Sequence, residues 1–541
     1  MLGGISSAAL YFRLVWIGSL RKPAFGFVVP TSVSRLNRIS PPSLLTAGAT
    51  TSTSPVGKMA YNGEILEPQG NHHAWYSLQP FFEAVQWSST PGTYFKEKKE
   101  KNGGAPIYKA HPGLKVITIT DHASGKWFFS QPDTVLDRQA REEGGRQRFG
   151  PLKCNEEYLG KALPALVTNA MEKHEGARDY MVAVLRERLA ATDTALEHAA
   201  ANFYKDLWAN GMGEYTTVYD LFLQQSYAFM LEWLFGTGEE GGQPLPPYKD
   251  FRTVNPSDIS VLIGLEVDTP IANLASKVAQ AVADGVSSEA KASIEVLLES
   301  IRSSKMWPSL TKMLEDSGLP TQDMDRSLMF SSGFQSSSAL AKQMEYCVGS
   351  LAANPDFLAE LRAELDGQEL TIKSVSDTER FPLLESFHWE ILRLYPAPPF
   401  FFKTAQMDLV VPTSSGAKYQ ASPEGDMLCC HHPLIHIDEA VFGPDAAEFK
   451  PKRFIGNPGL KDEVFAYAFP KPSEAGRVEG MPWGCAAHTL GVLDGILKVF
   501  YGRWVQEAEW EMKDPPIIDP VEYLGVVGPD ELEFAKVTPR K

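Results

Sequence analysis

The spacing of apolar positions along the chain predicts a mostly helical protein with a minor β region. Apolar residues recur three and four positions apart in long Ala-, Leu- and Glu-rich stretches, which is the period of an amphipathic helix. Short runs of β-branched residues that alternate sides predict strands. We expect helices over 193–207, 218–235, 383–394 and 486–505, and strands over 115–120, 409–411 and 426–430.

Two segments interrupt this pattern without dividing the chain into domains. Residues 236–247 and 455–483 are rich in glycine and proline and predict irregular loops. No internal repeat is visible, and no linker separates two halves of the body. We therefore expect residues 64–541 to form one domain.

Composition and charge narrow the class of function. The chain has 51 Lys and Arg residues against 67 Asp and Glu residues, a net charge of −16, which argues against a nucleic-acid-binding surface. Its five cysteines include no CxxC pair, so neither a disulfide scaffold nor a cysteine zinc site is indicated. No run of 18 apolar residues predicts a transmembrane helix.

The first 63 residues differ from the rest in charge. The first acidic residue is Glu64, whereas residues 1–63 carry six basic residues and fourteen Ser or Thr residues. Such a leader is typical of an organelle transit peptide. We expect residues 1–63 to be a targeting leader, with a plastid as the destination. An endomembrane or cytoplasmic location, or a disordered extension with no address, is the alternative.

Three features in a fixed order carry the candidate chemistry. Glu390 and Arg393 lie three positions apart on a helix and therefore share a face. Arg453, in the Phe-Lys-Pro-Lys-Arg-Phe sequence at 449–454, supplies a third charge, so we expect a buried Arg–Glu–Arg structural lock. Cys485 comes just before the last predicted helix, where a helix dipole would stabilise a thiolate.

This order of motifs resembles the cytochrome P450 superfamily, and most of all its fatty-acid-hydroperoxide-metabolising branch. That branch includes allene oxide synthases, hydroperoxide lyases, epoxyalcohol synthases and hydroperoxide bicyclases. The resemblance implies a single haem-thiolate domain of the P450 fold, with Cys485 as the axial ligand of the haem iron. It covers 380–510 well and 320–350 moderately.

Departures from the ordinary pattern favour the hydroperoxide branch. Where other members carry Phe, Gly and Arg before the cysteine and Gly after it, this chain has Val478, Met481, Trp483 and Ala487. An irregular insert before the cysteine, as in residues 455–483, is also similar to that branch.

The central-helix segment 331–338 points the same way. Monooxygenases usually place an acid and a threonine here to deliver protons, whereas this chain has Gln335 and Ser336 after Phe334. An amide cannot relay a proton as an acid does. It can hold a hydroperoxide by hydrogen bonds, so we expect Phe334, Gln335 and Ser336 to be catalytic. The alternative is that these side chains line a kinked polar helix.

The resemblance implies a reaction that needs neither dioxygen nor a reductase. The haem cleaves the O–O bond of a polyunsaturated fatty acid hydroperoxide homolytically, and the substrate radical rearranges. An epoxyalcohol synthase or bicyclase is favoured, with allene oxide synthase or lyase activity left open. Peripheral membrane association is an accompanying expectation. The alternatives are a reductase-dependent monooxygenase and a non-catalytic haem sensor.

Weaker signals complete the expected site. Trp483 and Lys403 are predicted to contact the haem, Lys403 through a propionate or else through the substrate carboxylate. Phe149, Phe400 and Phe401 are predicted to line the substrate pocket; ordinary core packing is the alternative. The histidines at 431, 432 and 436 do not match a metal motif, so no metal site beyond the haem iron is expected.

Overall fold

The long helices of the computed structural model follow the apolar periodicity of the sequence. Helix α7 spans Thr192–Asn210, α8 spans Val218–Phe235 and α17 spans Pro382–Leu394, which confirms three predicted helices. Three predicted strands are also present, as β3, β6 and β8, whose bounds follow below. The local patterns therefore determine these elements.

The structure describes fourteen stretches of the chain, all within the unit Gly63–Lys541. They are 65–70, 91–109, 116–132, 135–137, 171–212, 217–237, 295, 298–319, 324–328, 335–396, 400–422, 427–465, 490–515 and 532–540. The remaining helices are α3 (Pro91–Lys101), α4 (His122–Ser130), α6 (Met171–Arg188), η3 (Leu189–Ala191), α12 (Trp307–Asp316), α13 (Met324–Leu328), α14 (Gln335–Ala353), α15 (Pro355–Leu365), α16 (Ile372–Val375), α18 (His432–Ile435), α19 (Glu439–Phe442), η5 (Pro458–Glu463) and α21 (Leu493–Glu507).

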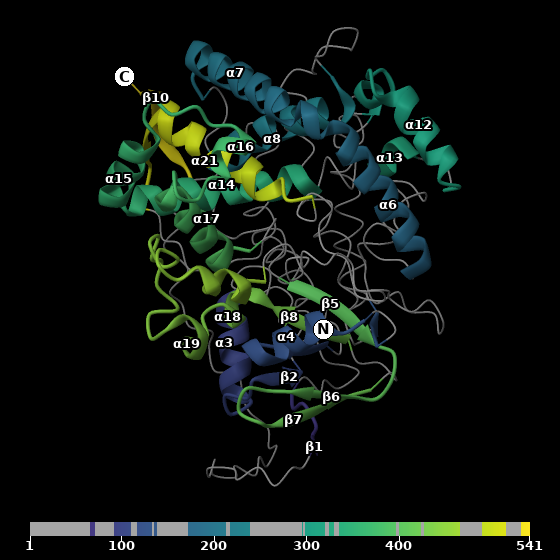
Figure 1. Ribbon diagram of the computed structural model, residues 1–541. Coiled ribbons are helices and arrows are strands. Elements are labelled where there is room, and N and C mark those ends of the chain that lie inside the picture. The colour runs from purple at the N-terminus through teal and green to yellow at the C-terminus, as the bar shows by residue number, and fades with distance from the viewer. Residues whose placement is uncertain are drawn as a thin grey trace, which may run out of the picture. The chain divides into compact units, whose positions relative to one another are not determined.

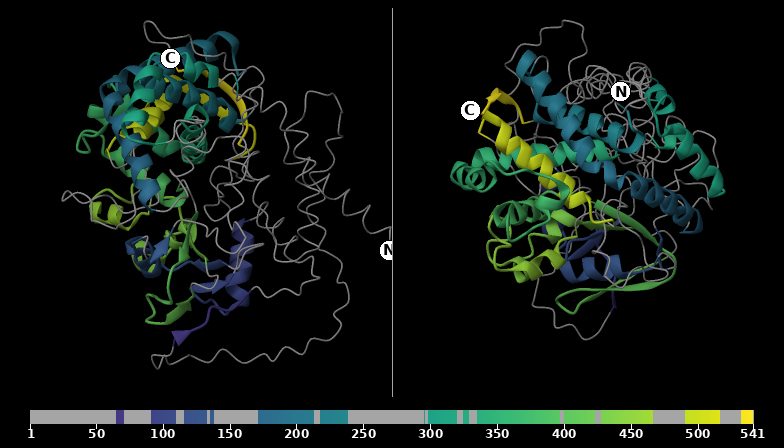
Figure 2. Two further views of the ribbon diagram at one scale, coloured as in Figure 1. Left: turned by 90° about the vertical axis from the view of Figure 1, so that its right-hand side faces the viewer. Right: turned by 45° about the horizontal axis from the view of Figure 1, so that its top comes forward.

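The strands form three small sheets near one end of this unit and at its C-terminus (Figures 1 and 2). They are β1 (Ile65–Leu66), β2 (Ile107–Lys109), β3 (Val116–Ile119), β4 (Leu136–Asp137), β5 (Phe400–Ala405), β6 (Leu409–Pro412), β7 (Lys418–Ala421), β8 (Met427–His431), β9 (Ala508–Met512) and β10 (Phe534–Pro539). Their orders are β2-β3-β8-β5-β4, β1-β7-β6 and β10-β9. The strands β3 and β8 pair in parallel, and β5 is antiparallel to β8.

The helical core is built around α8 and α14. Helix α8 is buried on nearly every side, because its many apolar and aromatic residues lie all round the helix rather than on one stripe. It packs along α14, and the aromatic rings of α21, including the fully buried Trp504, close the same core. Figure 1 shows α17 between this helical part and the β2-β3-β8-β5-β4 sheet. Side chains of α17 can therefore contact both parts.

The last long helix begins later than the sequence indicates. The prediction of a helix over 486–505 was wrong at its N-terminus, because α21 begins at Leu493. Residues 490 and 491 form a turn with Gly491 at φ +71°, a left-handed conformation that glycine adopts without steric cost. Cys485 and residues 486–489 lie outside the described residues, so the expected stabilisation of a thiolate by a helix dipole stays a prediction.

The described helices include none that is long and apolar enough to cross a membrane.

Candidate active site

Helix α17 carries the expected charged motif because its two ends are well defined. Pro382 occupies the first turn, where its missing N–H is not needed. The Glu364 carboxylate accepts the N–H groups of Leu383 and Leu384 at 2.9 and 2.8 Å. The helix ends at Leu394, just before Tyr395 and Pro396. The positions of Glu390 and Arg393 along the helix are thereby set.

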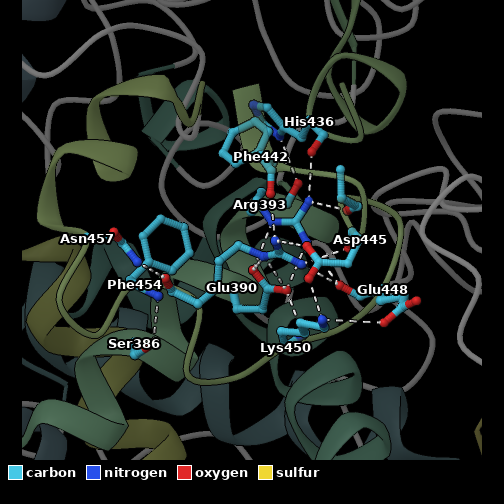
Figure 3. Close-up of polar contacts among 12 residues, drawn as sticks. Ser386, Glu390, Arg393, His436, Phe442, Asp445, Glu448, Lys450, Phe454 and Asn457 are labelled. Atoms are coloured by element: carbon cyan, nitrogen blue, oxygen red, sulfur yellow. Dashed lines mark hydrogen bonds and ion pairs between the residues drawn. The ribbon is translucent and has the colours of Figure 1, made fainter. Parts of the chain in front are cut away.

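Arg393 uses all five of its N–H groups (Figure 3). Its Nε and Nη2 donate to the two carboxylate oxygens of Glu390, each at 2.8 Å. The other N–H groups donate to three backbone carbonyls, those of His436 at 2.7 Å, Ala446 at 2.6 Å and Glu448 at 3.2 Å. Both side chains are fully buried. A lysine could not make this set of bonds, because it lacks the planar fork.

Arg453 completes the group from the other side of the Glu390 carboxylate. Its Nε lies 3.2 Å from Oε2 of Glu390. Its remaining N–H groups donate to the Phe442 carbonyl at 2.8 Å, to Asp445 at 2.6 and 2.8 Å, and to the Glu448 carbonyl at 3.1 Å. The structure therefore brings together Glu390, Arg393 and Arg453, as the sequence predicted. We call these three residues with Asp445 the charged lock.

Asp445 was not predicted, yet it balances the charge of the lock. Its Oδ1 accepts from Arg453 and its Oδ2 pairs with Lys450. These hydrogen bonds to Lys450 and Arg453 lower the pKa of Asp445 to about 2. Two carboxylates thus face two guanidinium groups, and the lock is neutral as a whole. The clue in the sequence was an aspartate eight residues before Arg453.

His436 is a second unpredicted member of this region. Its backbone carbonyl accepts from Arg393, and its ring Nδ1 lies 2.7 Å from the Arg393 carbonyl. Its Nε2 accepts the N–H of Phe465 at 2.8 Å, so Nδ1 carries the proton and donates. Burial, with the nearby His432, lowers the pKa of His436 well below its usual value. The ring is therefore a neutral structural link and has no free nitrogen to bind a metal.

The other two histidines of the group also lie in the core. His431 and His432 are fully buried, and the His431 Nδ1 accepts the N–H of Leu434 at 3.2 Å. Across the described residues, no group of three metal-ligating side chains is close enough to hold an ion.

Helix α14 begins at Gln335, so Gln335 and Ser336 occupy its first turn. Their side chains, and the whole of Phe334, lie outside the described residues. Further along, the Gln343 amide donates to the Tyr395 carbonyl and accepts from the Tyr501 hydroxyl at 3.2 Å. This one side chain therefore connects α14 to the end of α17 and to α21.

Lys403 lies in β5 and is almost fully buried. Its Nζ lies 3.2 Å from each of two backbone carbonyls, those of Phe128 and Gln131, and 5.1 Å from the centre of the Phe128 ring. A cation at this place satisfies the C-terminal carbonyls of α4. The expected contact with a haem propionate or a substrate carboxylate stays a prediction.

Two of the aromatic residues assigned to the substrate pocket lie on β5. Phe401 is partly buried and packs against Phe129, with ring centres 6.0 Å apart. Phe400 pairs with His431 across β5 and β8, while its side chain is not described. Phe149, Trp483 and Cys485 lie outside the described residues. Their roles stay predictions.

The three described cysteines are poor candidates for a thiolate. Cys347 lies on α14, and Cys429 and Cys430 lie on β8, all fully buried. Burial raises the pKa of each thiol well above its usual value. These three thiols are therefore held neutral in the core, and the other two cysteines, Cys154 and Cys485, lie outside the described residues.

Comparison with known proteins identifies relatives along almost the whole chain. The cytochrome P450 family model matches residues 315–469, which include the charged lock. An epoxyalcohol synthase of Ectocarpus siliculosus, CYP5164B1, is 88% identical over 483 residues, covering 89% of this chain and all of the relative. A mitochondrial hydroperoxide bicyclase of the same alga, CYP5164A3, is 52% identical over 88% of this chain and 92% of the relative.

Two more distant matches are also cytochrome P450 proteins by name. A mitochondrial hydroperoxide bicyclase of Plasmodiophora brassicae, CYP50918A1, is 30% identical over 85% of this chain and 81% of the relative. Among solved structures, a retinoic acid-bound cyanobacterial CYP120A1 matches with a TM-score of 0.56 and 16% identity, over 88% of this chain and all of that one. The latter similarity concerns the fold alone.

These relatives correct one expectation. The plastid destination predicted from residues 1–63 was wrong, because the two bicyclases are named as mitochondrial. An acid-free, Ser-rich leader with several arginines is common to both kinds of transit peptide, so composition did not separate the two organelles.

Proposed function

The chain belongs to the cytochrome P450 family, and on this premise we propose that it is an epoxyalcohol synthase acting on polyunsaturated fatty acid hydroperoxides. The observation that carries the proposal is the 88% identity to an epoxyalcohol synthase over that relative's full length. The reaction is an isomerisation, in which both peroxide oxygens stay in the product, one in an epoxide and one in a hydroxyl group. A hydroperoxide bicyclase is the second candidate, favoured by the 52% identical relative.

Members of the P450 family bind haem iron through a cysteine thiolate. The three described cysteines of this chain are unsuited to that role. Cys347, Cys429 and Cys430 are held as buried thiols in core elements. Of the remaining two, Cys154 and Cys485, only Cys485 lies where the family's motif order puts the ligand. When bound, the haem supplies the iron centre that cleaves the O–O bond of the substrate. We assign Cys485 as the axial ligand.

The protein itself contributes position and hydrogen bonding. The charged lock fixes α17 against residues 436–454, while Gln343 fixes α14 to α17 and α21. With α14 held in place, we propose that Gln335 in its first turn donates a hydrogen bond to an oxygen of the hydroperoxide. An amide does not deliver a proton to dioxygen, which supports a reaction without dioxygen or a reductase.

Residues 64–541 are proposed to form the haem domain, and residues 1–63 to be a leader outside it. We also propose peripheral contact with a membrane, the source of a lipid substrate. The exposed side chains of Ile65, Met407 and Val410, on or beside the β1-β7-β6 sheet, support this.

The test of the proposed function is an anaerobic assay. Purified ferric protein is mixed with a linoleate or linolenate hydroperoxide that carries ¹⁸O at both peroxide positions, without NADPH or a reductase. We expect rapid loss of the conjugated-diene absorbance and an epoxy alcohol that retains both labels.

The other outcomes identify the alternatives. A bicyclic product with both labels would favour the bicyclase. Loss of one label as water would indicate an allene oxide, and short aldehydes would indicate a lyase. No turnover by protein with a thiolate-ligated haem would contradict the proposal, and would point to a monooxygenase or a haem sensor.

A further inference from the structure

Helix α17 has a second polar face that the charged lock does not use. Glu385, His388 and Trp389 lie three and four positions apart and therefore share one side of the helix. All three are at least nine-tenths buried. The indole N–H of Trp389 donates to Oε1 of Glu385 at 3.0 Å, which holds the carboxylate in one orientation. Such an arrangement is costly to bury unless the carboxylate has cationic partners.

Those partners are two lysines that are far apart in the sequence. The Lys461 Nζ, from η5, lies 2.5 Å from Oε1 of Glu385. The Nζ of Lys498, from α21, pairs with Oε2 of the same carboxylate. Lys498 is almost fully buried, whereas Lys461 is about one-quarter exposed and lies over the Trp389 ring, 5.9 Å from its centre. One carboxylate thus binds a residue on each side of the segment 462–497.

A parallel contact strengthens the α21 side. The His388 Nε2 lies 3.0 Å from Oδ1 of Asp494, which is in the first turn of α21. Asp494 and Lys498 are four positions apart and face α17 together. On the η5 side, the contact with Glu385 is the ion pair of Lys461.

We propose that Glu385 is a positioning residue for the haem ligand, because it ties together the two ends of the segment that contains Cys485. This inference rests on the assignment of Cys485 under the proposed function. The carboxylate itself touches neither the haem nor the substrate. It acts by keeping η5 and the first turns of α21 at a fixed separation, which limits the positions that residues 466–489 between them can take.

The charge balance of the cluster depends on the Glu385 carboxylate. Burial alone would raise the pKa of Glu385, but Lys498 and Lys461, helped by His388, lower it to about 2. Glu385 and Asp494 together balance the two lysines. Removing the charge of Glu385 leaves Lys498 buried without its carboxylate, and a buried ammonium then loses its proton or moves outward.

The test compares two carboxylate substitutions, one on α17 and one on α15 at a residue that caps α17. Glu385→Gln keeps the shape but removes the charge that binds both lysines. Glu364→Gln is the matched control, because Glu364 caps the N-terminus of α17 and bonds to neither η5 nor α21 in the described structure. Both holoproteins are treated with a low concentration of protease, and cleavage between 464 and 492 is mapped by mass spectrometry. The absorption of the ferrous carbonyl complex and the rate of haem loss are measured in parallel.

We expect Glu385→Gln to accelerate cleavage within 464–492 by about tenfold or more, because breaking a buried ion pair favours local opening. The thiolate-type carbonyl absorption should fall and haem loss should accelerate. Glu364→Gln should leave all three at the parent level even where it lowers overall stability. Parent-like cleavage and spectra in Glu385→Gln would overturn the inference.

Lys461 provides a second pair of variants if Glu385→Gln does not fold. Lys461→Arg keeps the charge and should retain parent behaviour, whereas Lys461→Met should open the same segment. Equal behaviour of the two would contradict the tether. Failure of the hydroperoxide assay leaves these protease results unaffected, so the two hypotheses fail separately.

Discussion

Glu390→Gln is the sharpest perturbation of the charged lock, because it changes a charge and one atom type while conserving shape. In the parent, the carboxylate accepts from Arg393, from the Nε of Arg453 and from the backbone N–H of Lys450 at 2.7 Å. A glutamine accepts through one oxygen only. Its amide N–H groups would face a guanidinium N–H group at the other position.

The expected cost follows from burial and charge. Glu390 and Arg393 are fully buried and Arg453 is 6% exposed, so water cannot replace the lost carboxylate. The substitution gives the neutral lock a net charge of +1. Breaking a buried ion pair by removing one partner typically costs about 3–5 kcal/mol. With a urea dependence above about 3 kcal/mol/M for a chain of this size, the midpoint of unfolding should fall by about 1 M.

The assay is urea unfolding of the haem-loaded protein, followed by tryptophan fluorescence and by haem absorbance. Glu448→Gln is the matched control, since the Glu448 carboxylate is largely exposed and only its backbone carbonyl meets the lock. We expect the control to stay within about 0.5 kcal/mol of the parent. A Glu390→Gln variant that also stayed within this range would refute the reasoning that the charge of Glu390, rather than apolar packing, holds α17 to residues 436–454.

Three further predictions concern the site and its acid sensitivity. Gln335→Leu should slow hydroperoxide consumption or change the product ratio, measured by diene absorbance and mass spectrometry; unchanged rates and products would remove Gln335 from the site. Cys485→Ser should abolish the thiolate-type absorption of the ferrous carbonyl complex, whereas Cys347→Ser should keep it; the reverse result would reassign the ligand. His436 stays neutral when folded because its pKa is lowered well below 6.5, whereas the unfolded chain takes up the proton. Its contribution to stability is therefore complete above about pH 6.5 and is lost as the pH falls, by up to about 1.4 kcal/mol per unit. His436→Gln should flatten the pH dependence of the unfolding free energy between pH 6.5 and 5.5, and an unchanged slope would contradict this account.

The sequence determined the features that depend on residues close together in the chain. The apolar period set α7, α8 and α17, because helix formation and amphipathic burial are decided within a few turns. The three-residue spacing of Glu390 and Arg393 likewise fixed their shared face. The order of motifs pointed to the P450 family and to its hydroperoxide-metabolising branch, which the similarity to the two algal enzymes confirmed.

Where local patterns were ambiguous, the prediction was incomplete. Helical periodicity extended upstream of the true start of α21, because the left-handed Gly491 precedes the helix without changing the apolar spacing. Leader composition indicated an organelle but not which one. Apolar periodicity and composition show which structures a segment is compatible with, but they do not select between two similar ones.

Only the tertiary structure decided which distant residues meet. Asp445 pairs with Arg453, and His436 bonds to the Arg393 carbonyl. Lys461 and Lys498 both pair with Glu385, although no spacing rule connects any of these residues in the sequence. The physical reason is that the cost of burying each charge depends on partners delivered by other elements, often from far along the chain. The sequence shows which residue types are present. Which of them pair depends on how α17 packs against the rest of the protein.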